Sequence, residues 1–452
     1  MFGLALRTLR FRAATFAAAF LSMFLGASII MTFGSMFDTA LLGGASSAGT
    51  ETMVTMASVV GGWGLLLVVF AVASTLTLSI RQRAEEVALL KSVGATPGQI
   101  RRMVVGEAAV LSVAASALAV VPGLFAGRGL LEMLISTEQV NADVSYVFGP
   151  LAVAMGMGIT VVSSIGAASL AVRRASRMRV TESLADAAVD PGRMSKKRIA
   201  GAVAFLLLGL NLAIVTATAM RAEGSDAMQT AGQSSIWAAI GMAFLGPFAI
   251  RRVVALLAGP LQLLGGVTGY LAVCNLRQRT GQMASALTPI VLFTAIATGT
   301  LYMQSTENAA LAAAGLAKGL EQKNIETLNF VVIGMIVVFT AIMLVNTLLA
   351  ATAYRGREFA QQRLAGSTRR QVIAMVGLES AVLTVTGVLL GSIASLFTIA
   401  PYASVRLDSA LPDGGPLIWV GVTVLAVVLT LGTALGTARR SVRTPAVEAV
   451  AV

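Results

Sequence analysis

The chain has 452 residues, of which 56% are hydrophobic and 12% charged, and its mean hydropathy is +0.84. Soluble proteins carry about 25% charged residues, and no water-soluble fold hides this much apolar surface, so we predict a polytopic membrane protein. The sequence has no His, one cysteine and no GxxxxGK[ST] loop, which excludes His-based catalysis and His metal sites, an intrachain disulfide, and ATP hydrolysis by a phosphate loop of its own.

Ten uncharged runs are each long enough to cross a membrane, for which a helix needs about 20 apolar residues. In chain order they cover residues 13–37, 52–80, 108–127, 144–172, 199–220, 227–250, 280–306, 327–354, 380–405 and 414–438. The first run is too long for the core of a signal peptide, so we expect it to remain as an uncleaved span. The sequence therefore predicts an all-α protein with ten transmembrane helices.

Residues 253–276 form an eleventh uncharged segment whose placement is ambiguous. Arginines flank it on both sides, and Gly259-Pro260 and Gly265-Gly266 interrupt it. A further span here would place one basic cluster outside the membrane and invert every later span. We therefore expect the end of the sixth span followed by a segment that lies in the membrane interface.

Basic residues fall almost entirely in one set of loops. The exceptions among the 33 Lys and Arg residues are Arg128, Arg221, Lys318, Lys323 and Arg406. By the positive-inside rule the basic loops, and with them both termini, are predicted to be cytoplasmic. The net charge of +12 then reflects topology and contact with anionic lipid headgroups, and we expect no nucleic-acid partner.

The chain also contains an internal repeat. Residues 83–111 align without gaps with residues 355–383, and the matched pairs include Gly94 with Gly366 and Thr96 with Thr368. Two further matches keep the same order, and they pair residues 4–12 with 271–279 and residues 173–184 with 439–450. Self-similarity of this kind indicates a duplicated structural unit.

The repeat divides the chain into three parts. We predict a first four-span repeat at residues 1–190, a two-span spacer at 191–258 and a second four-span repeat at 259–452, a 4+2+4 arrangement. Each repeat has a basic leading helix, two spans, a short charged helix and two more spans. A cleft between two such halves is a natural geometry for moving a substrate or transmitting motion.

The short charged helices lie between the second and third span of each repeat. Residues 81–95 reach Gly94 and are followed by Pro97, and residues 355–365 precede Gly366, as expected for helices with a glycine stop. Their mixed charged and apolar faces suit docking into grooves of a soluble partner. A solvated loop that only sets topology is the alternative for one copy, but the duplicated register favours docking.

The segment RAEEVALLKSVGATPGQIRRMVVGEAAVL resembles the signature of the FtsX/MacB-type ABC transporter permease family. The signature has the form R-x-x-E-[IV]-x-x-L-[RK]-x-[LVI]-G-A-[TS], followed by a helix with a buried Glu. RRASRMRVTESL and LAVCNLRQR resemble the family's arginine-rich exit and its leading helix. The second copy departs at Gln361, Leu364 and Ala365, and only short loops at 38–51 and 307–326 stand where many relatives have a large extracytoplasmic domain.

This resemblance implies that the short helices are coupling helices, which contact a separately encoded ATPase that binds ATP and Mg²⁺. Carried over position by position, the coupling contacts are Arg83, Glu86, Leu90, Lys91 and Gly94, with Arg355, Glu358, Gln362, Arg363 and Gly366. Glu107 and Glu379 begin the third and ninth spans. Each either transmits force or serves as a cap or ion pair with a neighbour such as Arg102 or a partner helix.

The ten uncharged runs contain no ionisable residue by construction, and the nearest acids lie at the ends of spans, which disfavours a proton- or sodium-driven carrier. Uncharged polar residues remain in and beside these runs. Tyr302, Gln304 and Asn329, near the outer ends of spans seven and eight, are candidates for an outer-leaflet substrate cleft. Hydrogen bonds between helices are the alternative role for such side chains.

Together these features predict the permease subunit of an ABC transporter in a bacterial cytoplasmic membrane. We expect export of an amphipathic or hydrophobic compound, such as a drug, an antimicrobial peptide or a lipid. One permease chain, surrounded by membrane lipid, is expected to bind two ATPase copies, with no catalytic activity, metal or cofactor of its own. The alternative is a non-transporting subunit that transmits motion to an envelope enzyme or sensor, for which the outer loops are short.

Overall fold

The computed structural model describes residues 13–82, 89–90, 92–137, 139–177, 194–222, 227–315, 355–409 and 411–447, with single residues and one short stretch between 327 and 348. Within these ranges the chain forms helices and no strand, as the sequence predicted. The chain divides into two compact units. Unit 1 comprises Met1–Ala188 and Lys318–Met335, and unit 2 comprises Val189–Ala317 and Ile336–Val452.

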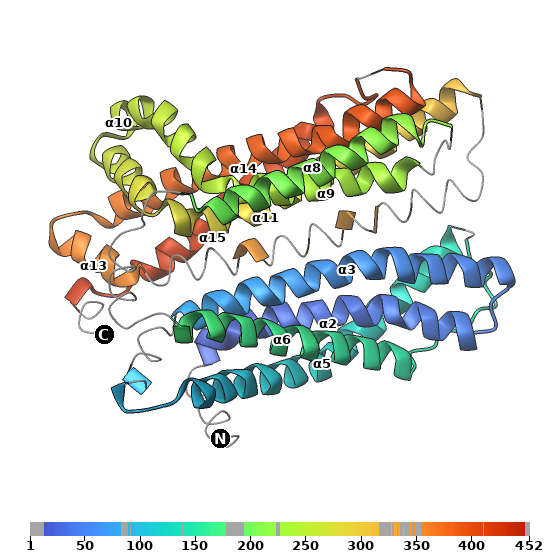
Figure 1. Ribbon diagram of the computed structural model, residues 1–452, viewed down its shortest axis with the longest axis horizontal. Coiled ribbons are helices and arrows are strands. Elements are labelled where there is room, and N and C mark those ends of the chain that lie inside the picture. Colours follow the sequence, from blue (N-terminus) through green and yellow to red (C-terminus); the bar gives the residue numbers. More distant parts are fainter. Residues whose placement is uncertain are drawn as a thin grey trace. The chain divides into compact units, whose positions relative to one another are not determined.

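Unit 1 is built around four long helices (Figure 1), which are α2 (Ala13–Leu42), α3 (Ser47–Gln82), α5 (Pro97–Ser136) and α6 (Pro150–Arg177). α2 and α6 each pack against the other three, whereas α3 and α5 share no extensive contact. These helices cover the first four predicted spans. We call the end of each unit where α5 or α14 begins the basic end, and the opposite end the far end.

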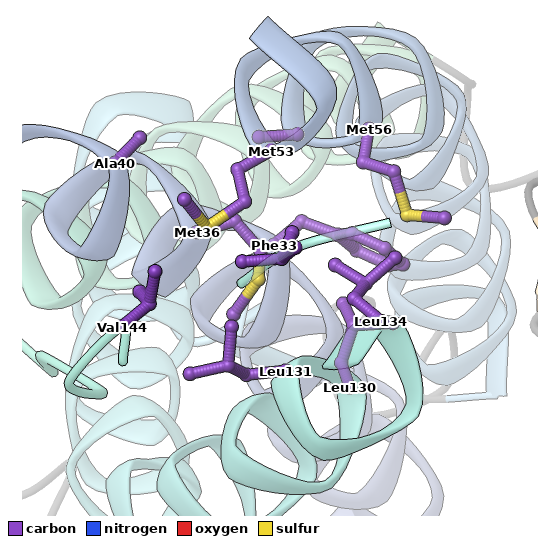
Figure 2. Packing of buried hydrophobic residues seen from close by; sticks show 11 residues of the cluster. Phe33, Met36, Ala40, Met53, Met56, Leu130, Leu131, Leu134 and Val144 are labelled. Carbon is purple, nitrogen blue, oxygen red and sulfur yellow. The ribbon is translucent and has the colours of Figure 1, made fainter. Parts of the chain in front are cut away.

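An apolar cluster fills the core at the far end of unit 1 (Figure 2). It joins Phe33, Met36 and Ala40 of α2 to residues of α3 and α5. The partners from α3 and α5 are Met53, Met56, Leu130, Leu131 and Leu134. Methionine fills irregular gaps between helices because its side chain is unbranched and flexible. Apolar side chains therefore make the contact between α2 and α5 at the far end of unit 1.

Polar contacts at the same end join α2 to α6 and to the loop before it. The buried carboxylate of Asp38 accepts hydrogen bonds from the backbone N–H groups of Ala152, at 2.8 Å, and Leu151, at 3.4 Å. These donors lie in the first turn of α6, where unpaired N–H groups and the helix dipole favour a negative charge. Thr39 Oγ1 both donates to and accepts from the backbone of Val147.

Unit 2 contains more helices. They are α8 (Lys196–Thr218), α9 (Ala227–Phe244), α10 (Gly246–Gln278), α11 (Thr280–Ala313), α13 (Gly356–Leu364), α14 (Arg369–Arg406) and α15 (Leu417–Ser441). α14 is central, and it contacts α8, α9, α10, α11, α13 and α15. The hairpin of α8 and α9 corresponds to the predicted spacer, and it packs onto α14 through polar groups. Ser234 Oγ donates to Phe397 O at 2.7 Å, and Thr398 Oγ1 donates to Ala231 O at 2.6 Å.

α10 is bent at Gly266, whose φ of 52° and ψ of −130° lie outside the helical region. Positive φ is easy only for glycine because other residues carry a Cβ atom that clashes there. The side chains of Leu263 and Leu264, just before the bend, are 86% and 91% exposed. The bend lies at the Gly265-Gly266 pair that the sequence indicated as a break, so α10 is not a straight helix over residues 253–276.

Eight helices in the described part of the chain are long and apolar enough to cross a membrane. Seven of them lie over predicted spans, and the eighth, the bent α10, begins at Gly246 within predicted span six. Helix α3 covers predicted span two, predicted span six is divided between α9 and the start of α10, and most of predicted span eight lies outside the described residues. The chain is thus an all-helical, multi-pass membrane protein, while the ten-span layout and the cytoplasmic placement of both termini remain predictions.

Candidate functional site

The turn that leads into α5 and the turn that leads into α14 have the same local structure. Gly94 and Gly366 have φ values of 97° and 104°, which end the preceding helical turn in the manner of a C-terminal glycine. The backbone N–H of Ala95 donates to Leu90 O, and at the matching position Ser367 N–H donates to Gln362 O, both at 2.9 Å. The duplicated glycine of the sequence is therefore a duplicated helix stop.

A capping box follows each stop. Thr96 accepts a hydrogen bond from Gln99 N–H while Gln99 Oε1 accepts from Thr96 N–H, and Thr368 and Gln371 form the same reciprocal pair. Such a box satisfies two backbone donors that a helix start leaves unpaired. The Thr and Gln shared by the two repeats thus fix where α5 and α14 begin.

α13, the predicted coupling helix of the second repeat, is attached to α14 through a buried ion pair. The Arg355 guanidinium, one residue before α13, donates through Nη1 and Nη2 to the two carboxylate oxygens of Glu379, the latter bond at 3.0 Å. Arg355 is 5% exposed and Glu379 2%. A two-pronged Arg–carboxylate contact fixes orientation as well as distance, so it holds the start of α13 against the first third of α14.

α10 contributes two further members of this network. Asn275 Nδ2 donates to Glu379 Oε1 at 2.8 Å, and Arg279 Nη2 lies 2.8 Å from Glu358 Oε2. Glu358 also accepts from Arg355 Nε at 3.3 Å. The five side chains from the end of α10, from α13 and its first flanking residue, and from α14 therefore form one connected cluster, which we call the basic-end network.

The buried guanidinium of Arg355 is stabilised in its charged form. Burial by itself lowers the pKa of the guanidinium, but the negative charge of Glu379 and its hydrogen bonds outweigh that effect, so the pKa is raised. The guanidinium also lies over the Phe359 ring, 4.9 Å from its centroid. Arg355 therefore keeps its positive charge while it is packed within unit 2.

The C-terminal part of α13 is bonded to the segment that follows α15. Arg363 Nη1 donates to the backbone oxygens of Val442, at 3.2 Å, and Thr444, at 2.8 Å. These acceptors follow the end of α15, where unpaired carbonyl groups favour a cation. α13 and the residue before it are thus bonded to α10, α14 and the segment after α15.

The predicted coupling contacts fall into different environments. Leu90, Gly94 and Gly366 are exposed, Gln362 and Arg363 are partly buried, and Arg355 and Glu358 point into the basic-end network. Arg83, Glu86 and Lys91 lie outside the described residues. Exposed apolar residues that are not among the predicted contacts accompany them, namely Leu89 at 66%, Val93 at 88% and Leu364 at 57% exposed. Contact with an ATPase stays a prediction for all of these residues.

The two acids that begin the third and ninth spans occupy matching places. Glu107 on α5 and Glu379 on α14 are each 2% exposed. For Glu379 the structure contains the ion pair that was one of the two roles open to it, and the pair runs to the helix that precedes α14. Whether either acid also transmits force stays a prediction.

The residues proposed for an outer substrate cleft are packed inside unit 2. Tyr302 Oη donates to Gly415 O at 3.2 Å, and Gln304 Nε2 donates to Asn308 Oδ1 at 3.3 Å, with both side chains less than 10% exposed. Asn329 lies outside the described residues. These bonds within the unit match the alternative role of polar side chains between helices, and a substrate contact stays a prediction.

A second charge cluster, which the sequence did not indicate, lies at the far end of unit 2 and is formed by Glu307, Tyr402 and Arg406. Glu307 and Arg406 each lie just beyond a predicted apolar run. A run that ends at its first charge leaves Arg406 in a loop, whereas α14 continues to that residue.

These elements define an all-helical membrane protein with two copies of a stop-and-cap turn ahead of a long span. Comparison with protein families agrees, since the family described as FtsX-like permease C-terminal matches twice, over residues 58–176 and 330–446. Together the two matches cover more than half of the chain. The chain therefore belongs to the FtsX-like permease family, and it is a transmembrane permease component of the ABC transporter type. A search of curated proteins found no match.

Proposed function

We propose that the chain is the membrane subunit of an ABC exporter in a bacterial cytoplasmic membrane, and that it moves an amphipathic or hydrophobic compound with ATP hydrolysed by a separate ATPase subunit. The observation that carries this proposal is the basic-end network. It bonds α13 to α10 and to the long span α14, so a push on α13 is passed directly into the membrane-spanning part of unit 2.

We place the ATPase contacts on the exposed apolar residues beside the two glycine stops. These are Leu89 and Val93 in the first repeat and Leu364 in the second. Exposed apolar side chains next to charged ones are typical of a docking patch. Arg355 and Glu358 then act behind this surface by holding α13 in place, and the ATPase itself carries ATP and Mg²⁺.

The docking test replaces the most exposed residue of each patch. We expect Val93→Asp together with Leu364→Asp to lower the amount of ATPase that co-purifies with the permease by at least about tenfold, because desolvated apolar contacts at an interface centre dominate binding. Leu411→Asp is the matched control, since Leu411 is 77% exposed in the loop before α15 at the far end. Equal retention of the ATPase by all variants would remove the docking assignment.

One permease chain carries both stop-and-cap turns, so we propose a complex of one permease and two ATPase copies. The expected mass of the purified complex is that of one permease chain and two ATPase chains, measured by native mass spectrometry. Two permease chains per complex would contradict this stoichiometry. Substrate-stimulated ATP hydrolysis in vesicles then separates an exporter from a subunit that only transmits motion, for which no transported compound is expected.

The bend of α10 gives a proposed contact with membrane lipid. Leu256, Leu263, Leu264 and Val267 are 67–91% exposed, and the exposed Arg252 and Arg277 lie toward the two ends of the helix. Amphipathic helices of this kind bury their apolar residues at the headgroup boundary and attract anionic lipids. In a chain whose native Trp residues are changed to Phe, we expect Leu264→Trp fluorescence to be quenched by brominated lipid, and Leu411→Trp serves as the comparison in the far-end loop.

A further inference from the structure

The far-end cluster of unit 2 is a buried carboxylate held by two donors from one neighbouring helix. Arg406 on α14 donates to Glu307 on α11 through Nε, at 2.6 Å to Oε2, and through Nη2, at 2.7 Å to Oε1. Tyr402 Oη, one turn before Arg406, donates to Glu307 Oε2 at 2.6 Å. Glu307 is 4% exposed and Tyr402 0%, while the Arg406 side chain is 20% exposed, so three directional bonds to a buried carboxylate join α11 to α14.

The first repeat has apolar residues at the three matching positions. The sequence match of residues 4–12 with 271–279, carried along the unbroken helices α2 and α11, pairs Ala40 with Glu307. The matching caps Thr96 and Thr368, carried along α5 and α14, pair Leu130 with Tyr402 and Leu134 with Arg406. All three residues of the first repeat are buried, and they lie together in the apolar cluster of Figure 2.

The difference matters because the first repeat proves that the fold can close this contact without any charge. A buried ion pair is seldom more stable than apolar residues of the same volume, yet it is costly to break once formed, since each half is left as an unpaired charge. Apolar contacts impose no such directional requirement.

We propose that the Glu307–Tyr402–Arg406 cluster is a latch that locks the far ends of α11 and α14 together, and that the corresponding α2–α5 contact of the first repeat is the one that slides. The polar contacts at the far end of unit 1 run from Asp38 and Thr39 of α2 to α6 and its preceding loop, and they leave the apolar α2–α5 contact free of that restraint. The two repeats are thus unequal, one fixed and one adjustable at its far end.

The latch is tested on the purified permease alone in lipid nanodiscs, so the result does not depend on the proposed ATPase. Amide hydrogen exchange reports local opening, and we expect the last two turns of α11 and of α14 to exchange at least about tenfold more slowly than those of α2 and α5. The decisive variant transplants the first repeat's residues, Glu307→Ala with Tyr402→Leu and Arg406→Leu. It should fold, because the first repeat does, and its α11 and α14 ends should exchange at the rate of α2 and α5.

Two further variants keep the test sharp. Arg406→Leu alone leaves Glu307 buried and short of its cation, so its midpoint of thermal unfolding should fall below that of the triple variant by several degrees. Tyr402→Phe removes one bond and keeps the ion pair, so exchange at the ends of α11 and α14 should rise only about two- to fivefold. Equal exchange in the two repeats of the unmodified protein, or unchanged exchange in the triple variant, would overturn the latch.

Discussion

At the basic end the stop-and-cap turns of the two repeats share the same hydrogen bonds, whereas at the far end the matched side chains differ in kind. Gly94 and Gly366 stop a helix with the same backbone hydrogen bond, and the same reciprocal Thr–Gln pair starts the next one. At the opposite end of the same two long helices, leucines in one repeat stand where a tyrosine and an arginine stand in the other.

The comparison teaches that different constraints act on the two ends. In the proposed function both turns present a helix to the same kind of partner, so one geometry is expected in both copies. No shared partner requires the far ends of the two repeats to keep one geometry, so one repeat is free to carry a charged contact there. Five predictions test this comparison, and the largest effect on stability comes first.

The largest effect is expected from breaking the Arg355–Glu379 pair. Arg355→Leu leaves the 2%-exposed Glu379 without its cation, and loss of one partner of a buried pair costs about 3–5 kcal/mol of the free energy of unfolding. The double variant Arg355→Leu with Glu379→Leu should recover most of that loss. Reversible unfolding in denaturant measures both variants, and Arg369→Leu, at an exposed position, is the control. A loss below about 1 kcal/mol for the single variant would show that the pair does not hold α13.

A smaller effect is expected from reversing the charge of Glu358. Glu358→Lys places a cation beside Arg279 and Arg355, so α13 should shift and ATPase co-purification should fall by well over tenfold, in line with the about 2–5 kcal/mol typical of a broken interfacial or partly buried pair. Glu358→Lys with Arg279→Glu should recover part of the binding. Absence of any recovery would place Glu358 in direct contact with the ATPase rather than behind it.

The same substitution at the matching acid, Glu86→Lys, sharpens the comparison between the repeats. The first short helix matches the family signature more closely, so Glu86→Lys should reduce co-purification more than Glu358→Lys does. A larger loss from Glu358→Lys would reverse the ranking of the two docking sites.

Much of this architecture was predictable because its determinants are local in sequence. Hydrophobic run length identified helices such as α2 and α14, and the duplicated glycine identified the helix stop, whereas the two capping boxes are seen only in the structure. Whether a charged side chain faces a partner protein or the interior of its own unit was not predictable in the same way. Arg355 and Glu358 are three residues apart on one helix face, and that spacing alone does not show whether the face meets a partner protein or α14.

The far-end latch escaped prediction for a related reason. Delimiting a span at its first charged residue assumes that charges lie in water, but Glu307 and Arg406 satisfy each other and remain within their helices. The proximity of two residues 99 positions apart follows only from the packing of α11 on α14. Tertiary pairing, rather than composition, decides whether a terminal charge is exposed or buried.

Equal, moderate effects are expected from the caps. Thr96→Ala and Thr368→Ala each remove the acceptor for one backbone N–H at a helix start, which costs about 1 kcal/mol. Because the two capping boxes have the same geometry, the two losses of stability should agree within about 0.5 kcal/mol. Thr96→Ser and Thr368→Ser keep the acceptor and serve as controls. Losses of stability that clearly differ would show that the two helix starts are unlike in energy despite their matching hydrogen bonds.

The smallest effect is expected from an exposed ion pair close to the latch. Arg221 Nη2 lies 2.7 Å from Asp408 Oδ1, a distance like that between Arg406 and Glu307, but the two side chains are 64% and 82% exposed. Water already solvates both charges and screens their attraction, so such pairs contribute about 0–1 kcal/mol. Arg221→Ala should therefore leave the free energy of unfolding nearly unchanged, and raising the salt concentration should remove what difference remains. Arg406→Leu, measured alongside, should be several times more destabilising and little affected by salt, because burial rather than distance sets the strength of the contact. A salt-insensitive loss in Arg221→Ala as large as that in Arg406→Leu would mean that the far end of unit 2 is held by both pairs together.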